Sequence, residues 1–153
     1  MNGFKHRNLS EIPCRQEDAG KFAYGRQEFL SKQEQANVVA SVYTLPPGKA
    51  AYPYHHHTRR EEVFYIISGE GSLRTPEGSR PVKAGDLMYF APSPEGAHQL
   101  TNTGSQPLVY LDVDYRPDLD AAFYPDSGKI GIWGRGTDRV YRLEDNVDYH
   151  EGE

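Results

Sequence analysis

Short segments rich in strand-forming residues, each followed closely by a turn residue, fill the middle of this chain of 153 residues. Pro or Gly follows every one of these segments within two positions. Strands spaced by turns at roughly ten-residue intervals are typical of antiparallel sandwiches and barrels. The segments cover residues 38–45, 62–67, 86–90, 98–102 and 108–115, and a hairpin is predicted over 72–82, around Pro76-Glu77-Gly78-Ser79. An all-β barrel with short helical turns is therefore expected.

The two ends of the chain differ from the middle in composition and in hydrophobic pattern. Residues 1–35 are polar and weakly periodic, and FLSKQEQA (29–36) is interpreted as a short helical turn. Residues 116–153 contain Trp133 and Tyr141 and end in an acidic stretch. These aromatic residues predict that the tail packs back on the barrel. We therefore expect a single domain over residues 1–153, because one core suffices at this length.

Charge and composition exclude several classes of protein. The net charge is -5, which argues against a nucleic-acid partner. An apolar run of the roughly 18 residues that span a bilayer is not found, so no membrane association is expected. The first residues, MNGFKHRNLSEIP, lack an apolar signal core, and a lone Cys14 cannot form an intrachain disulfide. A cytoplasmic location is expected.

A cluster of histidines and a glutamate carries the chemistry. Alternate residues of a strand share a face, so His55 and His57 are expected to point one way and His56 the other. Glu62 follows on the next strand after a turn, and His98 begins a later strand. If these segments meet inside a barrel, three imidazoles and one carboxylate converge. Such a set suits one divalent metal ion, with Zn, Mn, Fe and Ni all open.

An alternative interpretation is that the three consecutive histidines form a surface patch that binds metal only adventitiously. The strand context, Glu62 at a short offset and His98 after a Pro/Gly loop argue against it.

The residues also resemble a known family. The stretch from Gly48 to Gly69 is similar to the first motif of the cupin superfamily: a Gly, an H-x-H pair, a Glu and a second Gly. Residues 85–102 resemble the second motif, with a Gly, a Pro/Gly loop, His98 and Asn102. Gly48 lies one residue further from the first His than usual, and Gly96 lies two positions before His98 instead of three. Both departures fall in turns, where length varies readily.

This resemblance, over about a third of the chain, implies a double-stranded β-helix barrel of the cupin (jelly-roll) type. It further implies that His55, His57, Glu62 and His98 bind the metal ion.

Candidates for catalysis are polar residues near the predicted metal site. Tyr54, Arg60 and Tyr110 are singled out, because a Tyr can act as a general acid and an Arg can hold an anion. For each Tyr the alternative is a side chain of the barrel wall, and for Arg60 it is a solvated turn residue. Further candidates of the same kind are Tyr43, Tyr52 and Tyr89.

Three functions stay open at this point. The first is a metal-dependent isomerase or epimerase of a small polar substrate such as a sugar or sugar phosphate. The second is a metal-dependent dioxygenase, and the third is a non-enzymatic module that binds or senses a small ligand. A small-molecule partner is common to all three. A homodimer is also expected, because open barrel edges usually need cover.

Overall fold

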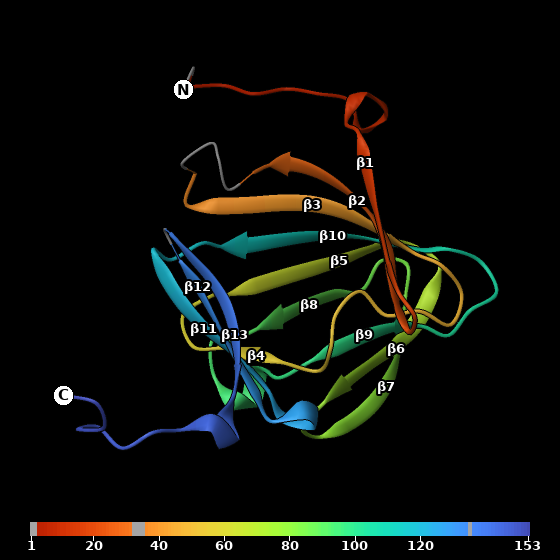
Figure 1. Cartoon of the computed structure of the whole chain (residues 1–153). Helices are drawn as coiled ribbons and strands as arrows, with labels where there is room; N and C mark the ends of the chain where they lie inside the picture. The colour runs from red at the N-terminus through yellow and green to blue at the C-terminus, as the bar shows by residue number, and fades with distance from the viewer. Residues whose placement is uncertain (1–2, 32–35, 135) are drawn as a thin grey trace.

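The computed structural model describes residues 3–31, 36–134 and 136–153, and its regular structure is strands joined by turns and short 3₁₀ helices (Figure 1). The prediction of an all-β chain with short helical turns is confirmed. The strands are β1 (Cys14–Ala19), β2 (Phe22–Leu30), β3 (Val38–Leu45), β4 (His56–His57), β5 (Glu62–Ser68), β6 (Glu70–Thr75), β7 (Gly78–Lys83), β8 (Leu87–Phe90), β9 (Gln99–Asn102), β10 (Leu108–Tyr115), β11 (Leu119–Tyr124), β12 (Lys129–Gly134) and β13 (Thr137–Arg142). The 3₁₀ helices are η1 (Leu9–Glu11), η3 (Pro94–Gly96), η4 (Pro125–Ser127) and η5 (Leu143–Asp145).

Within the described residues the strands form three antiparallel sheets. The largest has six strands in the order β1-β2-β3-β10-β5-β8. A three-stranded sheet, β7-β6-β9, lies beside it, and a four-stranded sheet, β13-β12-β11-β4, crosses one end of the large sheet (Figure 1). Because neighbours in the large sheet are distant in sequence, the chain winds between sheets rather than forming a simple meander. This arrangement is the double-stranded β-helix that the motifs predicted.

The core lies between the sheets and follows from the two-residue period of the strands. In β3 the side chains alternate strictly, with Tyr43 and Leu45 inside. Leu45, Ile66 and Leu108 are fully buried, and aromatic side chains pack around them. This core holds β3, β10 and β5 in register and thereby fixes the inner wall of the barrel.

The structure corrects the interpretation of the N-terminal segment. It forms the β1–β2 hairpin at one edge of the large sheet, where the sequence showed only weak periodicity. The helical turn predicted over residues 29–36 is wrong at its start, because Phe29 and Leu30 are the last residues of β2. Residues 32–35 of that prediction lie outside the described residues. Pairing with β3 overrides the weak local preference of this segment.

The C-terminal segment reaches the barrel through β11. Ala122 pairs with His57 and Phe123 with His56, so β11 lies directly against the short strand β4. Strand β12 pairs with β11, and β13 pairs with β12 to complete this sheet. The segment after residue 115 therefore contacts the same histidines that the sequence singled out.

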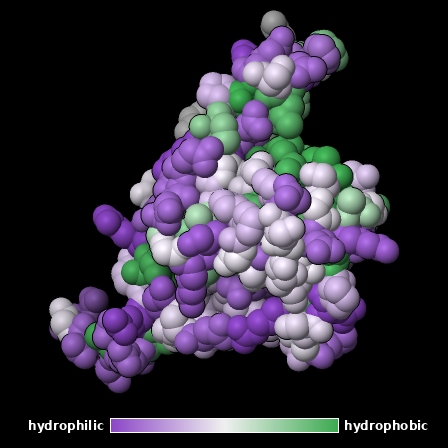
Figure 2. Space-filling view, turned by 90° about the vertical axis from the view of Figure 1, so that its right-hand side faces the viewer, coloured by the Kyte–Doolittle hydropathy of each residue, from purple (hydrophilic) through white to green (hydrophobic). Residues whose placement is uncertain are grey.

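The face of the molecule shown in Figure 2 is mostly hydrophilic or neutral, and its hydrophobic side chains gather toward the upper right. Within the described ranges, none of the helices has the length and apolar character that crossing a bilayer requires.

Candidate metal centre

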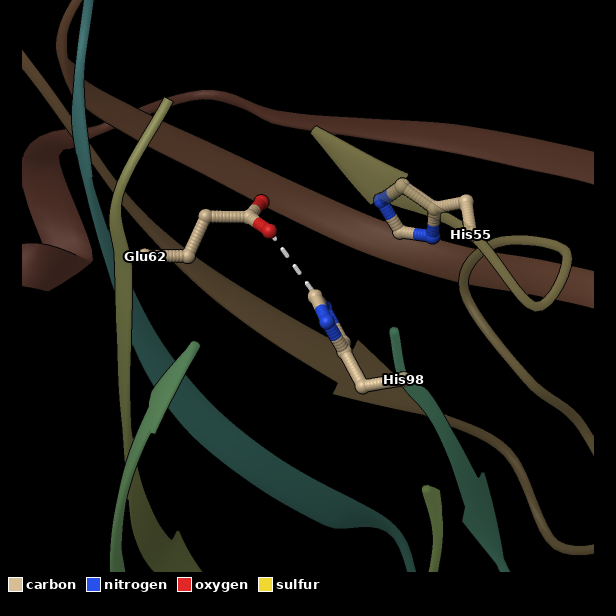
Figure 3. A group of neighbouring side chains, drawn as sticks. All are labelled: His55, Glu62 and His98. Atoms are coloured by element: carbon tan, nitrogen blue, oxygen red, sulfur yellow. Dashed lines mark ion pairs between the residues drawn. The ribbon is translucent and has the colours of Figure 1, made fainter. Parts of the chain in front are cut away.

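Three of the four predicted ligands form one cluster. Ligand atoms of His55, Glu62 and His98 all lie within 4.8 Å of one another, and all three side chains are buried. The Nε2 atom of His98 lies 3.4 Å from a carboxylate oxygen of Glu62, and the ring of His55 faces the same carboxylate (Figure 3). The two sequence motifs therefore meet at one point.

The backbone brings the two motifs together. His55 and His98 form an isolated antiparallel bridge, with hydrogen bonds from His55 N to His98 O (3.2 Å) and from His98 N to His55 O (2.9 Å). Glu62 is the first residue of β5, which belongs to the large sheet. After the bends at Thr58 and Arg59, β5 starts on the inward face, as the predicted turn between His57 and Glu62 required.

His57 stands beside this cluster. Its Nε2 lies 3.7 Å from the other oxygen of Glu62, and its ring centre is 5.1 Å from that of His55. The predicted alternation is confirmed, because His55 and His57 are both buried toward the interior while His56 stacks on Phe123 on the opposite side. All four predicted ligands therefore face one region of the barrel.

Each of the three histidines is held through its Nδ1 atom. The partner of His55 Nδ1 is Pro53 O at 2.8 Å, and that of His98 Nδ1 is Gly96 O at 3.0 Å. A carbonyl oxygen only accepts hydrogen bonds, so these rings carry their proton on Nδ1 and leave a lone pair on Nε2. The Nε2 atom of His98 is buried and has no hydrogen-bond partner among the described residues. This pattern is typical of histidines that bind metal through Nε2.

The third histidine is held by a carboxylate. The Nδ1 atom of His57 hydrogen-bonds to Asp120, a buried residue of β11. Asp120 also accepts hydrogen bonds from the backbone N–H groups of Thr58 (3.3 Å) and Arg59 (2.9 Å). Burial alone would raise the pKa of Asp120, but the hydrogen bond and charge of His57 lower it overall. Asp120 therefore stays ionised and orients the ring.

Burial favours the neutral form of two of the histidines, His55 and His98. It lowers the pKa of His98 to about 4, and burial together with the neighbouring His98 and His57 lowers the pKa of His55. A neutral imidazole is the form that binds metal. Burial, and next the charge of Asp114, raise the pKa of Glu62. A nearby cation would offset that cost, because it favours the charged carboxylate.

A cavity of about 180 Å³ opens beside the cluster. His55, His57 and Glu62 line it together with residues of β2, β3, β10, β11 and β12. Burial, and then Asp114, raise the pKa of Asp112. The other lining residues are Arg26, Val39, Tyr43, Tyr52, Arg60, Asp112, Asp114, Tyr124 and Trp133.

The predicted catalytic residues occupy three different environments. Arg60 lines the cavity and donates a hydrogen bond to Asp114 at 3.2 Å. Tyr110 is buried beneath the cluster, stacked on Tyr43, and borders a small void that Glu62 and His98 also line. Tyr54 faces away, under the guanidinium of Arg74, and is not among the cavity-lining residues. Its role as a general acid stays a prediction without a contact to the cavity. Of the further candidates, Tyr43 and Tyr52 line the cavity, whereas Tyr89 is 60 % exposed.

Several residues of the site were missed. Asp112 and Asp114 share the inward face of β10 with Tyr110, while the apolar Val113 and Leu111 face outward. Hydrophobicity alone predicts that Leu111 and Val113 face the core, so it assigns these positions of the strand to the wrong faces. The one available signal was that Asp112 and Asp114 lie two and four residues after Tyr110 and therefore share its face. Asp120 gave no signal, because its strand was not predicted.

The fold and the buried histidines define a double-stranded β-helix protein with a potential metal site at the barrel interior. The family model described as a cupin domain matches residues 41–114. The chain is also 39 % identical over 96 residues to the oxalate-binding protein of Thermotoga maritima, covering 61 % of this chain and 77 % of that protein. The chain belongs to the cupin family.

Two further similarities are to proteins described as isomerases. The chain is 35 % identical over 94 residues to the glucose-6-phosphate isomerase of Thermococcus onnurineus, which is 54 % of this chain and 49 % of the isomerase. It thus spans about half the length of that relative. The crystal structure of a sugar phosphate isomerase from Silicibacter pomeroyi superposes with a TM-score of 0.83 over 93 % of this chain and 95 % of that one, at 19 % identity. At that identity the likeness shows the fold alone.

Proposed function

We propose that the protein binds one divalent transition metal through His55, His57, Glu62 and His98. The observation that carries this proposal is the arrangement of the imidazoles. Every Nδ1 is held by a backbone or carboxylate oxygen, and the Nε2 atoms of His57 and His98 approach one carboxylate. A donor set of neutral imidazoles and a carboxylate fits Zn, Mn, Fe or Ni.

The charges around the cavity support the same proposal. Four buried carboxylates, those of Glu62, Asp112, Asp114 and Asp120, stand against the two arginines that line the cavity, Arg26 and Arg60. With the Asp112 carboxyl protonated, as its raised pKa implies, three negative charges stand against two positive ones. Buried negative charge without compensation is costly, and a bound cation would offset it.

We further propose that the site isomerises or epimerises a small polar substrate with an anionic end, such as a sugar phosphate. A bound metal would supply Lewis-acid polarisation of a substrate oxygen. Arg60 and Arg26 would hold the anionic end, since guanidinium groups bind carboxylate and phosphate well. Asp112, whose pKa is raised by burial, would donate its proton to a substrate oxygen, and the carboxylate so formed would take the proton from the adjacent carbon. Similarity to curated isomerases supports this reaction class.

A second candidate is a protein that binds a small anion at the metal without reaction. The observation in its favour is the 39 % identity to an oxalate-binding protein. Both functions use the same metal and the same arginines. They differ in turnover, which an experiment can measure.

The test begins with elemental analysis of protein purified without an affinity tag. Wild type should carry about one equivalent of a first-row metal, His98→Ala should lose it, and His56→Ala should keep it. His56 is the matched control because it faces away from the cluster. Loaded protein is then followed by NMR with a panel of aldose and ketose phosphates. Turnover supports the isomerase; tight binding of oxalate without turnover supports the second candidate. Absence of metal after reconstitution would refute both.

A further inference from the structure

A second group of buried acids lies beside the proposed metal centre. Glu62, Asp112 and Asp114 each contribute a carboxylate oxygen, and these three oxygens all lie within 4.8 Å of one another. Each of the three residues is only 6 % exposed. We call these residues the acidic cluster. The cluster shares Glu62 with the proposed metal centre but contains none of its histidines.

The strand register creates the acidic cluster. Asp114 of β10 is the Cα partner of Glu62 of β5, and Asp112 lies two residues before Asp114 on the same inward face. Like charges directly opposite one another in an antiparallel pair are destabilising. Burial strengthens this repulsion, because the protein interior screens charge poorly. The three carboxylates are therefore stable together only when a proton or a cation lies among them.

Two oxygens of the acidic cluster are available to bind an ion. Asp112 Oδ1 and Asp114 Oδ1 are buried, and neither has a hydrogen-bond partner among the described residues. Buried polar atoms are normally satisfied, so these two oxygens point to a ligand. Both residues also line the cavity of about 180 Å³, which gives an ion and its water ligands access to them.

The two arginines of the cavity compensate the acidic cluster only in part. Arg60 donates a hydrogen bond to Asp114 at Oδ2, which leaves Oδ1 available. Arg26 instead hydrogen-bonds to Ser41 (3.0 Å) and to Glu28 (2.8 Å). One contacting guanidinium against three ionised carboxylates leaves an excess of negative charge. A divalent cation would offset that excess.

We propose that the acidic cluster is a second cation site, which binds a hard divalent cation such as Ca²⁺ or Mg²⁺. Carboxylate oxygens and water are the ligands that these ions prefer, whereas zinc, iron and nickel suit the imidazoles of the proposed metal centre. Because both sites need Glu62, the two kinds of ion compete for the cavity. A cation in the acidic cluster would also take the place of the proton on Asp112 and inhibit turnover, a consequence that rests on the proposed function.

The test is calorimetric titration of metal-free protein with calcium chloride and, separately, with zinc chloride. Wild type should bind about one equivalent of either ion. Asp112→Asn and Asp114→Asn should each weaken calcium binding at least about 10-fold, because each removes a charged ligand, and should still bind zinc. His98→Ala should show the reverse pattern, with weakened zinc binding and the calcium affinity of wild type.

The matched control is Asp126→Asn, because Asp126 is a carboxylate that pairs with an arginine at the exposed surface. This variant should bind both ions as wild type does. Zinc-loaded wild type should bind calcium more weakly than metal-free protein, since Glu62 is shared. Circular dichroism checks that each variant is folded.

Three results would overturn the proposal: wild type that binds no calcium below about 1 mM, calcium binding that His98→Ala abolishes, or calcium binding that both asparagine variants retain. Failure of the proposed function gives a different result. Protein without zinc affinity would then still bind calcium at the acidic cluster.

Discussion

His57 and Asp120 are joined by a 2.5 Å hydrogen bond between Nδ1 and a carboxylate oxygen, although 63 positions separate them in the sequence. His57 belongs to the first sequence motif, whereas Asp120 comes from β11, outside both motifs. The C-terminal segment thus holds one of the proposed ligands in place. The cluster is built by three parts of the chain rather than two.

The first prediction concerns Asp120→Asn. The amide has the same shape but loses the negative charge and can present an N–H toward the ring, so His57 would no longer be held with its proton on Nδ1. Metal affinity should fall about 10- to 100-fold, as for other outer partners of ligand histidines. Competition with a chromophoric chelator measures the affinity.

The control for that prediction is Asp126→Asn. Asp126 also pairs with an arginine on the barrel, Arg74, but at the exposed surface. Its substitution should leave metal affinity unchanged. Equal losses in the two variants would mean that Asp120 acts only through general stability.

The second prediction uses the lowered pKa of His98 in metal-free protein. The unfolded chain takes up a proton on this residue near pH 6.5, but the folded protein does so only near pH 4. Between these values the unfolded state binds more protons, so stability falls as the pH is lowered. Wild type should lose about 3 kcal/mol of unfolding free energy through this group. His98→Gln should lack that loss.

Urea unfolding at about pH 7, 5.5 and 4, values that bracket the expected transition, measures the difference between wild type and the variant. His150→Gln, a substitution in the exposed C-terminal tail, should follow the wild-type profile. Parallel profiles for wild type and His98→Gln would show that His98 titrates normally.

The third prediction concerns removal of the metal. A metal that binds only the folded state at 100 times its dissociation constant adds about 2.7 kcal/mol of stability. For a chain of this size that shift corresponds to roughly 5–10 °C in Tm. Stripping with EDTA should lower Tm by that amount and restoring the metal should reverse it, measured by calorimetry. His55→Ala should show no metal-dependent shift, whereas His56→Ala should behave as wild type.

The fourth prediction concerns Gly96→Ala. A Cβ at this position would lie 2.1 Å from Ala91 O, so the backbone of the loop must move. The carbonyl of Gly96 is also the partner of His98 Nδ1. Both stability and metal affinity should fall, as chemical denaturation and chelator competition would report. Gly3→Ala is the control, because nothing lies within 4 Å of its added Cβ. Unchanged affinity in Gly96→Ala would separate the loop from the metal site.

The strands of the barrel were predictable where the local pattern and the tertiary pairing agree. Residues 38–45 and 108–115 were predicted within the exact bounds of β3 and β10, because β-branched residues end at turn residues there. The N-terminal hairpin and β11 were missed. Their sequences are polar or mixed, and pairing with the large sheet and with β4 makes them strands. Local strand propensity does not predict such pairing.

The sequence by itself predicted the fold class and the inward orientation of the four proposed ligands. Both predictions use strand period and motif spacing, which depend only on the order of residues along the chain. The tertiary structure decided the rest of the site. It turned Asp112 and Asp114 inward, brought Asp120 to His57, and set Tyr54 apart from the cavity. The physical reason is that a strand can bury charged side chains only where groups elsewhere in the barrel compensate their charge. Here that compensation comes from arginines and histidines in other parts of the chain, which no local pattern of β10 or β11 predicts.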